Sequence, residues 1–228
     1  MRLFAISAAC AALAAGLASA AATGHALERN ITASLEQADA RTKTCEGGTD
    51  ECRTAAQAAP HLLASMARRG VRCRQEAACL LSLVLLESDG LKFKHNVSPG
   101  RLGQGTSNMQ MCNFNVRLAR ELPAVAAELG PLPDADPPSD ETCGRVLPPL
   151  IRDDAINFDT PAWFLKTVCT NKDALRRLHD GAQDGCAMYL AGCVGVDGAD
   201  AKRLELNDKV YRAMGVDGRA GCLDLFPC

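Results

Sequence analysis

The stretch Ala78-Cys79-Leu80-Leu81-Ser82-Leu83-Val84-Leu85-Leu86-Glu87-Ser88 decides the fold, because it is the most apolar run after the amino terminus. With the four residues before it, it predicts a helix over 74–88 that is apolar nearly all round, as a buried helix is. Asp89-Gly90 follows, and a glycine is typical just beyond a helix end. The run therefore predicts a central core helix that ends on a carboxylate and a hydroxyl.

Helical spacing of apolar residues recurs on both sides of this run. It predicts helices over 26–42, 54–69, 108–122, 124–129, 161–168, 171–179, 182–190 and 200–214. Pro60 lies inside the second of these, so that helix is expected to begin either before the proline or at it. Residues 130–142 are rich in proline and acids and predict an exposed, extended loop. Strand-like alternation is nearly absent, so the predicted fold is mainly α.

The first twenty residues have the form of a secretory signal peptide. Arg2 supplies the positive start, an apolar run follows, and Ala18-Ser19-Ala20 matches a cleavage site. We therefore expect residues 1–20 to be removed and residues 21–228 to form a single soluble, secreted domain with no membrane anchor. Asn30-Ile31-Thr32 is a glycosylation sequon near the start of that domain.

Cysteine is the most informative part of the composition. The chain has 12 cysteines, and Cys10 lies in the expected signal peptide, which leaves eleven. They are Cys45, Cys52, Cys73, Cys79, Cys112, Cys143, Cys169, Cys186, Cys193, Cys222 and Cys228. In an oxidising compartment these predict disulfides with one cysteine left over. Cys45 with Cys52, or Cys222 with Cys228, can close short loops, but the sequence leaves the connectivity open.

Several function classes are disfavoured by composition and motif. The formal net charge is −2 and there is no basic run, so nucleic acid is not an expected partner. No CxxC pair or Cys/His cluster has zinc spacing, and no serine-hydrolase, zinc-protease or phosphate-loop motif is present. We therefore expect no metal and no cofactor, and a monomer as the assembly.

Glu87 is the candidate catalytic residue. Leu80 and Val84 precede it by seven and three positions, so it falls on or beside the inward face of the central helix. Burial and the negative end of the helix dipole both disfavour a charged carboxylate there. A protonated acid is what general-acid cleavage of a glycoside requires. The alternative is a carboxylate bound by an arginine or by backbone amides at the end of a core helix.

The segment Gly103-Gln104-Gly105-Thr106-Ser107-Asn108-Met109-Gln110-Met111 is the candidate substrate site. Its glycines permit close approach to the backbone, and its neutral hydroxyls and amides suit a sugar polymer. The predicted substrate-binding residues are Ser88, Gly103, Gly105, Thr106, Asn108 and Gln110. The alternative is a plain glycine-rich connection, in which Met109 and Met111 fill the core.

These motifs carry a resemblance. Leu86-Glu87-Ser88, then Ser98-Pro99-Gly100, then Met109-Gln110-Met111 resemble the Glu-Ser, Ser-x-x-Gly and Met-Gln pattern of goose-type lysozymes and lytic transglycosylases. The resemblance implies a lysozyme-like helical fold in which a glutamate acts as acid and base on a β-1,4-linked, N-acetylated cell-wall polysaccharide. The chain departs from the pattern in a longer loop after Glu87 and in Asn108, where the family has leucine; the family's later Tyr-Asn element is also not evident.

The mature chain also resembles a group of small, secreted, cysteine-rich fungal proteins with no established activity. That resemblance rests on Glu87-Ser88-Asp89, on residues 99–111, on Pro161-Ala162-Trp163-Phe164-Leu165 and on Gly192-Cys193-Val194-Gly195.

A second catalytic carboxylate is not singled out by the sequence. Asp89, Asp153, Asp154 and Asp159 are the possible partners, and a single-glutamate mechanism fits better than a pair. Two hypotheses remain. In the first, Glu87 cleaves or binds a peptidoglycan- or chitin-type glycan. In the second, a lysozyme-like scaffold serves as a non-catalytic, secreted binding or effector-like protein.

Overall fold

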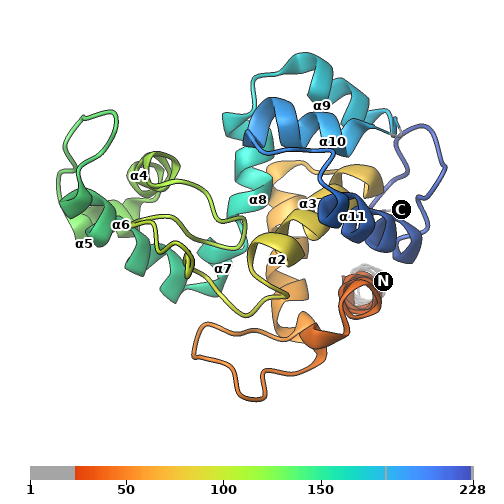
Figure 1. The fold of residues 1–228 in the computed structure, drawn as a ribbon, viewed down its shortest axis with the longest axis horizontal. Helices are drawn as coiled ribbons and strands as arrows, with labels where there is room; N and C mark the ends of the chain where they lie inside the picture. Colours follow the sequence, from red (N-terminus) through yellow and green to blue (C-terminus); the bar gives the residue numbers. More distant parts are fainter. Residues whose placement is uncertain (1–23, 183, 227–228) are drawn as a thin grey trace, which may run out of the picture.

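The computed structural model describes residues 24–182 and 184–226, and in this part of the chain it is built from helices (Figure 1). A helix over 24–38 and a 3-10 turn, η1 (Ala40–Lys43), come first. The other elements are α2 (Ala55–Arg69), α3 (Arg74–Glu87), α4 (Cys112–Glu121), α5 (Pro123–Leu129), α6 (Asp140–Arg152), α7 (Asp154–Asn157), α8 (Thr160–Trp163), the π-helix η2 (Phe164–Val168), α9 (Lys172–His179), α10 (Gly185–Tyr189), the π-helix η3 (Leu190–Val194) and α11 (Ala201–Ala213). The prediction of a mainly α fold is confirmed. The predicted signal peptide lies outside the described residues.

The central helix is α3, as its sequence predicts. Every residue from Gln75 to Leu85 is buried. Helix α11 packs along it, and two polar contacts fix their register. Asn207 donates to the Ser82 hydroxyl at 3.1 Å, and the Tyr211 hydroxyl donates to the Gln75 carbonyl at 3.2 Å. None of the described helices is long and apolar enough to cross a membrane.

The apolar interior has two parts. The larger part surrounds α3 and takes in the helix over 24–38, α2, α9, α10 and α11. The smaller part lies among α4, α5 and α6, which gather on one side of the molecule in Figure 1. Trp163 and Phe164 belong to the smaller part, where Phe164 meets Phe114 edge to face at 4.9 Å. Trp163 is completely buried and anchors this part of the core.

Several helix boundaries differ from the sequence prediction, and helix α6 was not predicted. Helix α4 begins at Cys112 rather than at Asn108, because Thr106 and Met109 have positive φ angles of 66° and 48°, which do not continue into a helix. Helix α6 begins at Asp140, inside the predicted 130–142 loop, where Ser139 caps it by accepting from the Thr142 amide. Because prolines are disfavoured inside helices, the two adjacent prolines of this segment led the sequence analysis not to predict a helix here.

Helix α2 runs straight through Pro60. It starts at Ala55 because Thr54 and Gln57 form a reciprocal capping box, which satisfies two amides at the first turn. Gly70 closes the helix in the left-handed conformation at φ 73°. Of the two starts that the sequence left open, the one before the proline is therefore correct.

Five disulfides join the ten described cysteines. The pairs are Cys45–Cys52, Cys73–Cys222, Cys79–Cys186, Cys112–Cys143 and Cys169–Cys193. The local closure of Cys45 with Cys52 is confirmed. The suggested pairing of Cys222 with Cys228 is wrong, because Cys222 reaches back to Cys73 at the start of α3. Cys228 lies outside the described residues.

Candidate functional site

Glu87 is the last residue of α3 and is bound by an arginine of α11. Nη2 of Arg203 lies 2.7 Å from Oε1 of Glu87, and the two side chains are only 15% and 19% exposed. The contact joins residues 116 positions apart, so it exists because α11 packs along α3. The geometry matches the alternative in which an arginine holds the carboxylate at the end of a core helix.

Ser88 has a local structural role. Its hydroxyl donates to the Val84 carbonyl at 2.6 Å and accepts from the Leu91 amide at 2.9 Å. Both partners belong to the end of α3 or to the turn after it, and Ser88 is 2% exposed. The hydroxyl therefore satisfies backbone groups that the helix end leaves unpaired.

The polar side chains of the glycine-rich segment point into the protein and bond to one another. Thr106, Asn108 and Gln110 are at most 6% exposed. The Thr106 hydroxyl lies 2.9 Å from Oδ1 of Asn108, and Nε2 of Gln110 donates to Oδ1 of Asn115 at 2.7 Å. Asn115 in turn donates to the Gly103 carbonyl at 2.8 Å. This network holds the loop from within, and each of these side chains already has a protein partner.

The two glycines are needed for packing of the chain against itself. A Cβ on Gly103 would lie 2.8 Å from Cβ of Cys143, next to the Cys112–Cys143 disulfide. A Cβ on Gly105 would lie 2.6 Å from the Lys94 carbonyl oxygen. These close contacts account for both glycines without a ligand.

The predicted site residues are thus divided between two places. Glu87 faces α11, whereas Thr106, Asn108 and Gln110 form a separate buried network, and no hydrogen bond in the described chain joins Glu87 to Gln110. Their role in binding sugar stays a prediction. Of the predicted core fillers, Met109 is buried, but Met111 is 44% exposed.

The possible second carboxylates have partners of their own. Asp153 caps α7, and Asp154 pairs with Arg53 and Lys94. Asp159 accepts hydrogen bonds from Ser65, Arg68 and Arg69 of α2.

The outer surface of the glycine-rich loop borders a shallow hollow of about 400 Å³ against α6. Its lining includes Leu102, which is 53% exposed, and His95, whose Nδ1 lies 2.8 Å from Oε1 of Glu51. The hollow is mainly apolar; Gln104 lines it, whereas Asn108 and Gln110 do not. The buried network of Thr106, Asn108 and Gln110 is therefore separate from this hollow.

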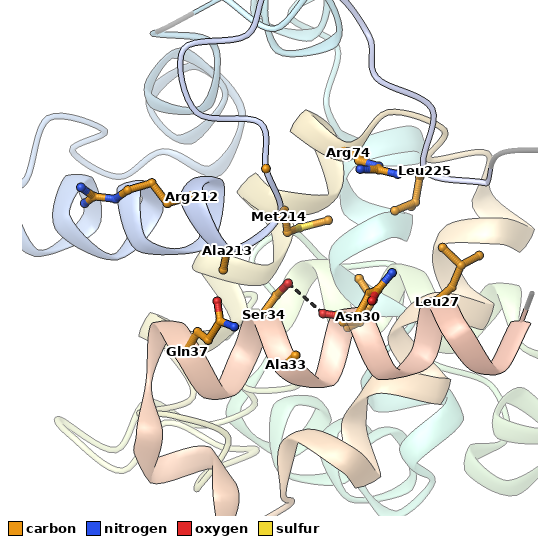
Figure 2. A pocket seen from close by; sticks show the side chains of 12 residues that line it. Leu27, Asn30, Ala33, Ser34, Gln37, Arg74, Arg212, Ala213, Met214 and Leu225 are labelled. Atoms are coloured by element: carbon orange, nitrogen blue, oxygen red, sulfur yellow. Dashed lines mark hydrogen bonds between the residues drawn. The ribbon is translucent and has the colours of Figure 1, made fainter.

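A second hollow was missed by the sequence analysis. It has a volume of about 370 Å³ and lies between the helix over 24–38, the end of α11 and the segment before residue 226 (Figure 2). Leu27, Ile31, Met214 and Leu225 form its apolar lining. Because these residues come from the two ends of the chain, no local pattern groups them.

Arg74 is the polar group at one end of this hollow, which we call the terminal pocket. Figure 2 shows Arg74 beside Leu225, whereas the Arg212 side chain extends along α11 away from the centre. Nε of Arg74 donates to the Asp224 carbonyl at 3.0 Å, which orients the guanidinium. Among the described residues no carboxylate lies within 4.0 Å of it. One sequence signal, which was not used, could have singled out Arg74: a cation in the first turn of a helix opposes the helix dipole.

Cys73, Cys222 and His179 form a third cluster, with ligand-type atoms within 4.8 Å of one another. The two cysteines are joined as a disulfide. Cysteine binds a metal as a free thiolate, so these two are not metal ligands in this state. The cluster is therefore a disulfide beside a histidine. Nδ1 of His179 lies 3.2 Å from Sγ of Cys73 and 3.4 Å from Oε1 of Glu76.

Comparison with known proteins gives one partial similarity. The chain is 34% identical over 160 residues to a bifunctional dioxygenase–epoxy alcohol synthase of Fusarium oxysporum (strain Fo5176). The aligned part is 70% of this chain but only 12% of that protein. The two activities in its name are those of that whole protein. No protein-family model matches the sequence, and no solved structure matches it.

Proposed function

We propose that this chain is a non-catalytic binding protein on a lysozyme-like, disulfide-stabilised scaffold, and that its ligand is a small aliphatic carboxylate held in the terminal pocket. The pocket is the observation that carries the proposal. A ligand site is typically a concave, mostly apolar space of this size with a few oriented polar groups. The buried Ile31 and Leu225 offer an apolar lining, and Arg74 offers an oriented cation without a carboxylate partner among the described residues.

The state of Glu87 supports the non-catalytic part of the proposal. A glutamate that protonates a glycosidic oxygen has to present its carboxyl group to the substrate. Here the carboxylate is held 2.7 Å from Arg203 in a largely buried pair. The amides that the resemblance implies for sugar binding are occupied by Asn115 and by one another. Cleavage or binding of a cell-wall glycan through Glu87 is the competing proposal.

The ligand part is tested by calorimetric titration with decanoic acid as the probe. Arg74→Gln is expected to weaken binding by about tenfold, the effect of losing about 1.4 kcal/mol from one charged hydrogen bond. Arg29→Gln is the matched control, because Arg29 is exposed on the helix over 24–38 and does not line the pocket. Decanol should bind wild type about as weakly as decanoate binds Arg74→Gln. Absence of decanoate binding, or equal loss in both variants, overturns the ligand proposal.

The non-catalytic part is tested separately with peptidoglycan and chitin oligomers. We expect no turnover by wild type, by Glu87→Gln or by Arg203→Met, which frees the carboxylate from its partner. Turnover by wild type that is lost in Glu87→Gln establishes the glycosidase instead. Retention on insoluble chitin without turnover, reduced by Glu87→Gln, supports a glycan-binding protein over the pocket ligand.

A further inference from the structure

We infer that Cys73–Cys222 is a thiol-exchange site, at which a small thiol opens the disulfide while His179 supplies the proton to the departing sulfur. The inference goes beyond the proposed function and is independent of the ligand in the terminal pocket. It rests on three features of this disulfide. Cys222 is exposed, His179 lies beside Cys73, and hydrogen bonds hold the two joined segments together.

Exposure separates this disulfide from the others. Cys222 is the one disulfide-bonded cysteine among the described residues that is classed as exposed, while its partner Cys73 is fully buried. Both members of Cys79–Cys186 and of Cys112–Cys143 are at most 8% exposed. Exchange requires a thiolate to reach one sulfur in line with the bond that breaks. Access therefore favours attack on the sulfur of Cys222, with Cys73 as the leaving group.

The histidine lies on the side of the leaving sulfur. Nδ1 of His179 is 3.2 Å from Sγ of Cys73, within reach for proton transfer. The carboxylate of Glu76, 3.4 Å from the same nitrogen, supports the protonated ring, and Lys166 binds that carboxylate at 2.8 Å. On His179's own helix and just after it, Arg176 and Asp180 pair with each other at 3.6 Å. A protonated imidazole at this position stabilises the sulfur as it leaves.

The exchange balances in two steps. A thiolate forms a bond to Sγ of Cys222 as the Cys73–Cys222 bond breaks, and the electron pair goes to Sγ of Cys73, which takes a proton from His179. A second thiolate then attacks the sulfur of the small thiol in the mixed disulfide. It releases the oxidised small disulfide and leaves Cys222 as a thiolate, which takes up a proton. Two thiols are oxidised and one protein disulfide is reduced.

The opened form is expected to stay folded. The segment after Cys222 is also held to the start of α3 by backbone hydrogen bonds, from the Arg74 amide to the Leu223 carbonyl at 2.8 Å and from the Leu225 amide to the Arg72 carbonyl at 2.7 Å. Gln75 adds a side-chain contact, since its Oε1 accepts from the Leu223 amide at 3.0 Å. These contacts do not depend on the sulfur–sulfur bond.

The test is a time course of the native protein with reduced glutathione, quenched with acid, alkylated, and mapped by peptide mass. We expect Cys73 and Cys222 to be modified about tenfold faster than Cys79–Cys186 or Cys112–Cys143, with the mixed disulfide on Cys222. Circular dichroism should be unchanged when they have reacted. Earlier opening of any other disulfide, simultaneous opening of all five, or the mixed disulfide on Cys73 overturns the inference.

The role of His179 is tested with His179→Gln, which keeps a polar side chain at this half-exposed position. Opening is expected to slow by about tenfold and its dependence on pH to flatten, because glutamine cannot give a proton to the departing sulfur. His25→Gln is the matched control, at an exposed histidine paired only with Glu28 among the described residues. A variant with unchanged rate and pH profile shows that the histidine takes no part.

Discussion

The carboxylate of Glu87 and the guanidinium of Arg203 come from residues 116 positions apart and meet in a largely buried pair. Removing one member of such a pair leaves an unpaired charge, whereas removing both leaves none. The residue therefore has a stability role that can be measured whatever its chemistry.

A double-mutant cycle measures that role. We expect Arg203→Met to destabilise the protein more than the double variant Glu87→Gln/Arg203→Met does, with a coupling energy of about 1–3 kcal/mol. Urea unfolding of the four proteins supplies the free energies. Additive effects, with a coupling below about 0.3 kcal/mol, contradict the pair's importance.

Two glycines with opposite surroundings give a second prediction at this scale. Gly105→Ala places a Cβ 2.6 Å from a backbone oxygen, so the loop has to shift and the protein is expected to lose about 2 kcal/mol or more of stability. Gly144 lies exposed in α6, where the nearest atoms to an added Cβ are 3.9 Å away. Gly144→Ala should therefore stabilise the protein by about 0.5–1 kcal/mol. Thermal unfolding compares the two, and a similar effect in both contradicts the packing role of Gly105.

At the scale of elements, the helices that were predicted well are those whose apolar period and end residues agree. For α3, the sequence shows both the apolar run from Ala78 to Leu86 and the glycine that ends the helix, Gly90, whose φ is 71° in the structure. Helix α6 could not be predicted, because Pro148 and Pro149 lie inside it and its stability comes from packing against α4.

The terminal pocket could not be predicted either, because its walls come from distant segments that meet only through tertiary packing. The loop from Gly103 to Met111 was located, but the inward direction of its amides depends on Asn115.

The junction of α2 with α8 depends on Asp159. Burial alone raises the pKa of this carboxyl, but hydrogen bonds from Arg69 and Ser65 and the charges of Arg69 and Arg68 outweigh it and lower the pKa below its usual range. A lowered folded-state pKa means that the unfolded chain binds the proton more tightly. The stabilisation is therefore complete above the unfolded value of about 4 and is lost as pH falls through the folded value.

Acid unfolding tests this junction. Between about pH 5 and 2 the wild type should lose more stability than Asp159→Asn, which has no proton to take up at this position. Asp134→Asn is the control, because the Asp134 side chain is fully exposed. Urea midpoints measured across that range give the comparison. Parallel curves for wild type and Asp159→Asn contradict the argument.

At the scale of the whole molecule, the disulfides span very different lengths of chain, from 7 residues in Cys45–Cys52 to 149 in Cys73–Cys222. Three of them, Cys45–Cys52, Cys112–Cys143 and Cys79–Cys186, span 7, 31 and 107 residues. Chain-entropy estimates for these three loops are about 2.4, 3.7 and 4.8 kcal/mol.

Replacing each pair by alanine should therefore destabilise the protein in that order, as measured by guanidinium unfolding. The buried Cys79–Cys186 pair joins α3 to α10, so its loss adds a packing defect to the entropic effect. A larger loss for Cys45–Cys52 than for Cys79–Cys186 contradicts the predicted order.

The terminal pocket has a consequence for how the protein is made. Its walls are residues 27–37 on one side and residues 212–215 and 225 on the other. During synthesis residues 27–37 leave the ribosome long before residues 212–225 are made. The apolar face of this first wall is therefore exposed to solvent through most of translation. A product that stops short of residue 212 keeps most of its core helices and lacks the cavity altogether. Ligand binding thus reports that residues 212–225 have been made and have packed on the helix over 24–38, and the ligand itself favours that packed state.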